Sequence, residues 1–345
     1  MSLSTTQSSP SRIARRTRGQ THGPVTRLMS PSDFGQLLKP FVFLDLFDNH
    51  GKPFSGFGLH PHSGIATLTY VMEGNVGYED TNGATGLLPA GGIEWMRAGA
   101  GVWHGGGVGE PGRTRGFQLW IALPPMLELG LSESIYQGPE VIRRDGPARV
   151  LLGSYNTATS AIEAPSPINY LAVKLKAGER WRYQPPAEHT VLWTAIGMGS
   201  VLVPEEIREG ELVAFDPSNA AIEFEAVTDA EFVLGSAVPH RYELVLGTHS
   251  VHTNVEALRE AEARIAKLRA AADTAALVRD SLERALTAEE RARGQAEIAA
   301  AADRAARADA EAEVLALRQA EQVRRQLGRV ARLRAAWRDG ASEGQ

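Results

Sequence analysis

Cysteine is absent from all 345 residues of the sequence. Its absence excludes disulfide bonds, zinc–thiolate sites and a thiol nucleophile, and it is typical of a reducing compartment. Long apolar runs are missing too, because no stretch reaches the ~18 apolar residues of a membrane-spanning helix. The net charge of −5 is small and gives no reason to expect nucleic acid or an anionic membrane as a partner. We therefore expect a cytoplasmic protein without a membrane span.

Acidic side chains are missing from residues 1–22, and so is the apolar central stretch of a secretory signal. This segment is rich in Ser and Thr and carries Arg12, Arg15, Arg16 and Arg18. An organelle transit peptide has a similar composition. We interpret residues 1–22 as a disordered basic tail.

Proline is absent after residue 254, where glycine also becomes rare and alanine, arginine and glutamate dominate. Before that point, short apolar runs such as "ATLTYVMEG", "GFQLWIALPP" and "TVLWTAIGMGSVLV" end in turn residues, which is typical of many short β-strands. The pattern predicts an all-β fold of two barrels followed by a helical extension. The expected boundaries are 23–125 for the first barrel, 126–167 for an irregular connection, 168–253 for the second barrel and 254–345 for the extension.

The extension has an apolar seam at alternating steps of three and four residues, from Leu258 to Leu286 with a break at Arg279. This spacing indicates a coiled coil or a helical hairpin, and the alanines in the seam make it thin. Such a helix needs a partner, either a second copy or another protein. Its end, "QVRRQLGRVARLRAAWR", is basic and could contact an acidic partner, nucleic acid or a membrane surface, although we favour a solvated face or a partner helix.

Three histidines stand out in the first barrel. His60 and His62 lie two residues apart in "LHPHSG", and His104 follows a glycine turn in "GAGVWHGGG". Residues i and i+2 of a strand face the same side, so His60 and His62 can both point into the barrel. A third imidazole from a neighbouring strand would complete a set of ligands for a transition metal.

The segments "PFVFLDLFDNH", "HPHSGIATLTYVMEGNVGYEDTNGATGLLPAGGIEWMRAGAGVWHGG", "GERWRYQPPAEHTVLWTAIGMGSVLV" and "ELVLGTHSVHTN" resemble the pirin family of the cupin superfamily over about residues 12–265. The resemblance implies two tandem cupin barrels and a mononuclear metal, usually iron, in the first. It also implies flavonol (quercetin) 2,3-dioxygenase activity or regulatory binding to other proteins. The expected cofactor is Fe(II) or another divalent transition metal, and a flavonol-like molecule is the expected small-molecule partner.

The sequence departs from the family at two carboxylates. The usual ligand glutamate falls on Gly106, and a second acidic residue falls on Ala66. Glu94 in "LPAGGIEWM" stands where other cupins place a metal-binding histidine. We therefore expect a rearranged site of His60, His62, His104 and Glu94, with Glu94 also the candidate catalytic carboxylate. The alternative is that Glu94 pairs with an arginine such as Arg97 or Arg113, or lines a metal-free polar pocket.

Other signals are weaker. Glu110 lies in a Gly/Pro loop and is a minor candidate ligand. His249 and His252, in the closing segment, are expected to cap or pack, and the second barrel to be structural. Phosphate-loop and nucleophile-elbow motifs are missing. Two functions stay open: a metal-dependent dioxygenase, and a non-catalytic regulator or scaffold that acts through its helical extension.

Overall fold

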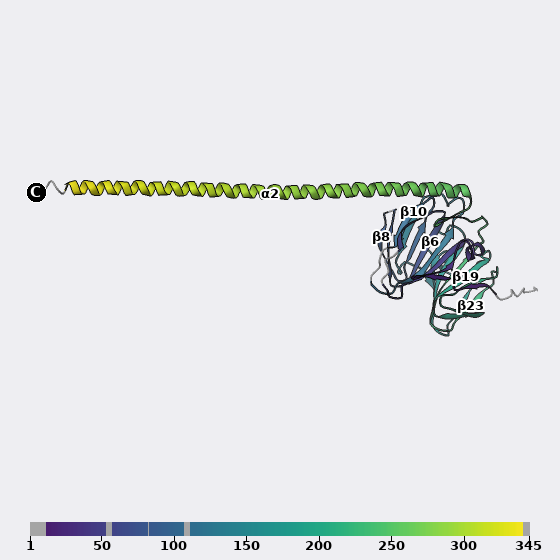
Figure 1. Ribbon diagram of the computed structural model, residues 1–345. Coiled ribbons are helices and arrows are strands. Elements are labelled where there is room, and N and C mark those ends of the chain that lie inside the picture. The colour runs from purple at the N-terminus through teal and green to yellow at the C-terminus, as the bar shows by residue number, and fades with distance from the viewer. Residues whose placement is uncertain (1–11, 53–56, 82, 107–110, 341–345) are drawn as a thin grey trace, which may run out of the picture. The chain divides into compact units, whose positions relative to one another are not determined.

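The computed structural model describes residues 12–52, 57–81, 83–106 and 111–340. They form two antiparallel β-barrels and a C-terminal helix (Figure 1). The prediction of two tandem cupin barrels with a helical extension is confirmed. Within the described residues no helix is both long and apolar enough to cross a membrane.

The first barrel consists of two facing sheets. Its seven-stranded sheet has the order β12-β9-β6-β11-β4-β3-β2, and its four-stranded sheet the order β5-β10-β7-β8. The strands are β2 (Gln20–His22), β3 (Val25–Met29), β4 (Phe41–Asp48), β5 (Phe57–His62), β6 (Ile65–Glu73), β7 (Asn75–Asp80), β8 (Thr85–Pro89), β9 (Ile93–Arg97), β10 (Val102–Gly106), β11 (Arg115–Ala122) and β12 (Glu133–Gln137), with a one-turn helix α1 (Phe34–Leu37) before β4.

The second barrel repeats this plan. Its seven-stranded sheet has the order β1-β22-β19-β24-β17-β14-β13, and its four-stranded sheet the order β18-β23-β20-β21. The strands are β1 (Ile13–Thr17), β13 (Arg144–Asp145), β14 (Ala148–Leu152), β17 (Ile168–Leu175), β18 (Arg180–Tyr183), β19 (Val191–Met198), β20 (Ser200–Val203), β21 (Glu205–Arg208), β22 (Leu212–Phe215), β23 (Ile222–Ala226) and β24 (Ala230–Ala237). Two small hairpins complete it: β15 (Ser154–Tyr155) with β16 (Ala158–Thr159), and β25 (Val245–Gly247) with β26 (Ser250–His252).

The two barrels share one hydrophobic core, which contains buried side chains from the seven-stranded sheet of each. Phe41 of β4 meets Trp193 of β19 edge to face, with ring centroids 5.3 Å apart. Tyr70 of β6 donates a hydrogen bond of 2.7 Å to Glu231 of β24. In β9, Ile93 and Trp95 point into this shared core, so the intervening Glu94 faces the interior of the first barrel.

Two segments that were expected to lack regular structure contain strands. Residues 12–22 are not a disordered tail: β1 pairs with β22 of the second barrel and β2 pairs with β3 of the first. The connection 126–167 is not irregular throughout, because β12 joins β9 and β14 joins β17. β1 and β12 gain their hydrogen bonds from strands far away in the sequence, whereas β2 pairs with the adjacent β3. Residues 1–11 lie outside the described part.

Helix α2 spans Val255–Gly340 without interruption, so the extension forms no hairpin turn. The Asn254 side chain caps its start by accepting a hydrogen bond of 2.8 Å from the Ala257 N–H. Ala257 and Ala261 are buried, and Leu258, Ile265 and Leu268 are half-buried, because the first turns pack on the first barrel and the β25–β26 hairpin. The start of the predicted seam is therefore covered within the chain itself.

Candidate metal centre

The three histidines converge on one point inside the first barrel. His60 and His62 lie on β5, and β10 pairs with β5 so that His104 stands directly opposite His60. The ring centroids are 4.8 Å apart for His60 and His62, 4.6 Å for His60 and His104, and 5.0 Å for His62 and His104. One ligand nitrogen from each ring lies within 4.8 Å of the others. The spacing of two residues on β5 explains why His60 and His62 point the same way, as the sequence predicted, and the pairing of β10 with β5 adds His104.

Each imidazole has its Nδ1 atom engaged by an oxygen. Nδ1 of His60 lies 2.7 Å from the Gly58 carbonyl, and Nδ1 of His62 lies 2.7 Å from the His249 carbonyl. Nδ1 of His104 lies 3.1 Å from Oε1 of Glu94. A carbonyl oxygen only accepts, so Nδ1 of His60 and Nδ1 of His62 carry the hydrogen, and in the neutral ring each Nε2 keeps its lone pair. This is how metal-binding histidines are held in proteins.

The Nε2 atoms fit a metal ion. Nε2 of His62 and Nε2 of His104 are buried and have no hydrogen-bond partner among the described residues. A buried, unpaired polar atom costs about 1–3 kcal/mol, which a bound cation would recover. Burial, together with the neighbouring His104, lowers the pKa of His60 to about 4, and burial lowers the pKa of His62 well below its ordinary value. Both rings are therefore neutral at pH 7, the state in which imidazole binds metals.

Glu94 contacts the His104 ring at Nδ1, the nitrogen that does not belong to the unpaired Nε2 set. Its Oε1 faces Nδ1 of His104, and its Oε2 accepts a hydrogen bond of 3.1 Å from Thr69 of β6. Neither suggested arginine pairs with it: Arg97 lies 3.5 Å from Glu133, and Arg113 lies 2.6 Å from Asp48. Glu94 does not belong to the group whose ligand atoms lie together.

The structure also places Gly106 and Ala66, the two positions at which the family usually has a carboxylate. Gly106 ends β10 and offers no side chain, and Ala66 is buried in the core between the barrels. Glu110 falls outside the described residues. The histidine site therefore has no carboxylate in the place where the family resemblance puts one.

A cavity of about 580 Å³ opens onto the site. His60 and His62 line it together with Phe43 and Trp120, whose rings stack with centroids 4.0 Å apart. Apart from His60 and His62, the lining residues were not expected from the sequence, among them His22, placed in a disordered tail, Gln118, and His249, expected only to cap or pack. Distant strand pairing brings them together, and no local pattern could have revealed it.

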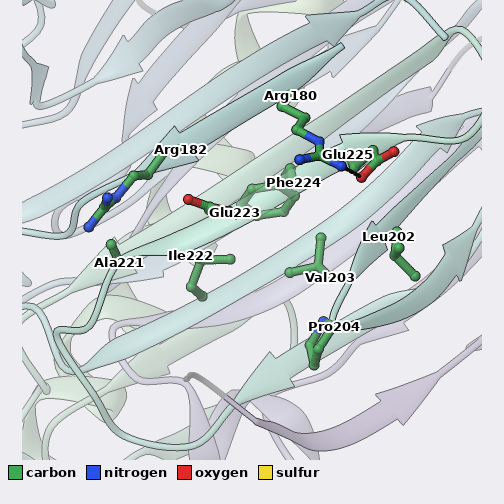
Figure 2. Close-up of a pocket in the computed structure, with 10 residues that line it drawn as sticks. All are labelled: Arg180, Arg182, Leu202, Val203, Pro204, Ala221, Ile222, Glu223, Phe224 and Glu225. Atoms are coloured by element: carbon green, nitrogen blue, oxygen red, sulfur yellow. Dashed lines mark ion pairs between the residues drawn. The ribbon is translucent and has the colours of Figure 1, made fainter. Parts of the chain in front are cut away.

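The second barrel has a different pocket, of about 470 Å³, over β18, β20 and β23 (Figure 2). Arg180 and Glu225 form an ion pair of 2.8 Å across it, and no histidine lines it. Among the described residues, only the first barrel brings together a set of histidines and carboxylates that could bind a metal.

Comparison with known proteins agrees with this geometry. The Pirin family model matches residues 23–121, which contain all three histidines. A pirin-like protein of Caulobacter vibrioides is 33% identical over 225 residues, which cover 62% of this chain and 81% of that protein. The chain belongs to the pirin family.

Other proteins are similar to this chain in sequence or in fold. A Pseudomonas aeruginosa protein with a provisional quercetin 2,3-dioxygenase name is 32% identical over 63% of this chain and 81% of its own length. The crystal structure of a quercetin 2,3-dioxygenase from Acinetobacter baumannii superposes with a TM-score of 0.67, at 23% identity, over 75% of this chain and 98% of that one. A nickel(II) complex of an Escherichia coli pirin gives a TM-score of 0.51 at 21% identity, over 64% and 95% of the two chains.

Proposed function

We propose that the first barrel binds one divalent transition metal through Nε2 of His60, His62 and His104 and supports a dioxygenase reaction on a flavonol-like molecule. The unpaired, buried Nε2 atoms of His62 and His104 carry the proposal. The quercetin dioxygenase names of two similar proteins support the substrate class, and the nickel complex of a similar fold supports a divalent ion. Iron(II) is the proposed metal, and the cytoplasm the proposed location.

When bound, iron(II) would supply a Lewis acid and a redox centre for a substrate hydroxyl and dioxygen. The chain supplies the rest of the site. Phe43 and Trp120 add apolar surface to the cavity wall, and the Phe43 ring stacks on Trp120 with the Arg27 guanidinium 4.2 Å from its centroid. Nε2 of Gln118 is buried without a partner among the described residues and is free to donate to a substrate oxygen.

A proton acceptor is also present in the cavity. Asp45 lines it and is held by Arg27 through contacts of 3.0 and 3.1 Å. Burial raises the pKa of Asp45 above its ordinary value, which suits a carboxylate that takes a proton from a substrate hydroxyl. Glu94 does not line the cavity, so we assign it the positioning of His104 rather than a catalytic step.

Metal content and oxygen uptake test the proposal. Protein purified without chelator should contain close to one metal ion per chain, and protein loaded anaerobically with iron(II) should consume oxygen when quercetin is added. A chain that holds no metal under either condition would contradict the proposal. Metal binding without oxygen uptake would support the metal site and contradict the dioxygenase reaction.

The role of Glu94 gives a separate prediction. Glu94→Gln should weaken metal binding about 10–100-fold, because the neutral amide holds His104 less firmly, while one ion still binds at saturation. Cobalt(II) titration followed by visible absorption measures both the affinity and the ligand set. If Glu94 is itself a ligand, the cobalt spectrum of the variant will change as well. Glu133→Gln, a half-exposed carboxylate paired with Arg97, is the control and should leave the affinity unchanged.

A second function, as a scaffold, is favoured by one observation. Large apolar side chains of α2 are exposed beyond residue 270, among them Leu282 at 65% and Leu286 at 61%. Because isolated helices are marginally stable in water, we propose that this part of α2 pairs with a second copy of the chain.

Light scattering on the full-length chain tests this pairing. The wild type should have the mass of a dimer, and Leu282→Asp with Leu286→Asp should reduce it to that of a monomer. Leu277→Asp is the control, since Leu277 is also exposed, at 69%, but lies on another face of the helix than Leu282 and Leu286. An unchanged mass in the double variant would exclude pairing along this seam.

A further inference from the structure

The β25–β26 hairpin brings a fourth histidine to the metal site. His249 lies at its turn and lines the same cavity as His60 and His62. Its ring centroid is 5.7 Å from that of His60 and 6.1 Å from that of His62. Two imidazoles that bind one ion through nitrogen at ~2.1 Å in tetrahedral geometry have centroids about 5 Å apart. The two separations exceed this spacing by about 1 Å, and His249 does not belong to the group formed by His60, His62 and His104, so its side chain must turn inward to bind.

The backbone of His249 is fixed by the site itself. Its carbonyl accepts the hydrogen bond from Nδ1 of His62, although the two residues lie 187 positions apart. Ser250 bridges to Ser63, the neighbour of His62, and Val251 N–H donates to the Ser63 carbonyl at 3.3 Å. His249 also has a φ of 59°, a left-handed conformation that is uncommon outside glycine and asparagine. Such a conformation at a cavity wall is often retained for function.

The side chain of His249, in contrast, is exposed and contacts the rings of His60 and His62 edge-on. No hydrogen bond or ion pair to its imidazole occurs among the described residues. Rotation about its side-chain torsions can therefore bring a nitrogen inward without moving the backbone.

The site has a position for such a ligand. Three histidines leave at least one coordination position open on a transition metal, and Gly106 has no side chain to fill it. We infer that His249 is the fourth protein ligand and takes the place of the absent carboxylate. This inference rests on the proposed metal site. Four neutral imidazoles leave the ion its full 2+ charge, so the site should favour the divalent over the trivalent state.

Cobalt(II) binding to the full-length chain tests the inference. His249→Asn is the informative variant, because asparagine tolerates a positive φ and keeps the carbonyl that His62 uses. The wild type should bind one cobalt(II), and His249→Asn should bind it at least 10-fold more weakly with an altered visible spectrum. His50→Asn is the matched control, since His50 is also exposed with a φ of 50° but does not line the cavity, and it should behave as the wild type.

The outcomes separate the two proposals. Wild-type affinity and spectrum in His249→Asn would overturn the inference and leave the three-histidine site intact. Absence of cobalt binding by the wild type would overturn the proposed function itself. Pulsed electron paramagnetic resonance on the copper(II)-loaded wild type counts the bound imidazoles without any variant: four support the inference and three contradict it.

Discussion

Replacing Glu128 by alanine should destabilise the barrels by about 3–5 kcal/mol. Glu128 is only 2% exposed and accepts three hydrogen bonds: 3.1 Å from Nδ1 of His252, 2.7 Å from the Thr253 N–H and 2.6 Å from the Thr253 hydroxyl. Burial lowers the pKa of His252, so its neutral ring donates to Glu128 and accepts from the Ser63 hydroxyl at 3.0 Å. The variant leaves these donors buried without an acceptor.

Urea unfolding followed by tryptophan fluorescence measures this loss. Glu133→Ala is the matched control: Glu133 is 43% exposed and its contact with Arg97 is 3.5 Å, so the variant should change stability by less than about 1 kcal/mol. Equal stabilities of the two variants would show that the hydrogen bonds of Glu128 contribute little. Since Glu128 anchors the end of the β25–β26 hairpin, the variant should also weaken metal binding through His249.

Much of the histidine site was predictable because its geometry is local. The spacing of His60 and His62 places both on one face of a strand, and the glycine turn before His104 returns the chain to the neighbouring strand. The inward direction of Glu94 follows from the same alternation, since Ile93 and Trp95 occupy the opposite face. The group that Glu94 contacts could not be predicted in this way. Whether its carboxylate reaches the metal or Nδ1 of His104 depends on the side-chain torsions of Glu94.

The unexpected parts of the site depend on contacts between distant segments. Residues 12–22 have the composition of a disordered tail, yet β1 finds an unpaired edge at β22, almost 200 residues later. Likewise, nothing near His249 in the sequence distinguishes it from a surface histidine. Its position depends on the bridge between Ser63 and Ser250.

In the helical extension, the local pattern correctly predicted an apolar face. The same pattern fits packing against the barrel and pairing with another helix. The spacing from Leu258 to Leu268 predicted a helix with an apolar seam. The structure covers this part of the seam with the first barrel, where Ile265 lies against Gly101 and its carbonyl accepts a hydrogen bond of 3.4 Å from Trp103. Periodicity identifies an apolar face but not the surface that covers it.

His62→Ala should lower metal affinity more than 100-fold and abolish quercetin-dependent oxygen uptake. The expected loss exceeds the 10–100-fold effect of removing a residue that only orients a ligand, because a ligand itself is lost. His62 is 1% exposed, and its ring lies edge-on to Trp120 with centroids 4.8 Å apart, so some stability is lost as well. His189→Ala separates the two effects. His189 is 5% exposed in the second barrel and contacts the Ser236 hydroxyl at 2.9 Å.

Metal titration and urea unfolding on both variants distinguish a ligand from a buried structural residue. We expect similar losses of stability, with metal binding lost only in His62→Ala. Normal metal affinity in His62→Ala would mean that the ion binds elsewhere, and the unpaired Nε2 atoms would then need another explanation. A parallel loss of affinity in both variants would attribute the effect to the fold. A loss of metal affinity in His62→Ala but not in His189→Ala is the result that assigns the metal to the histidines of β5 and β10.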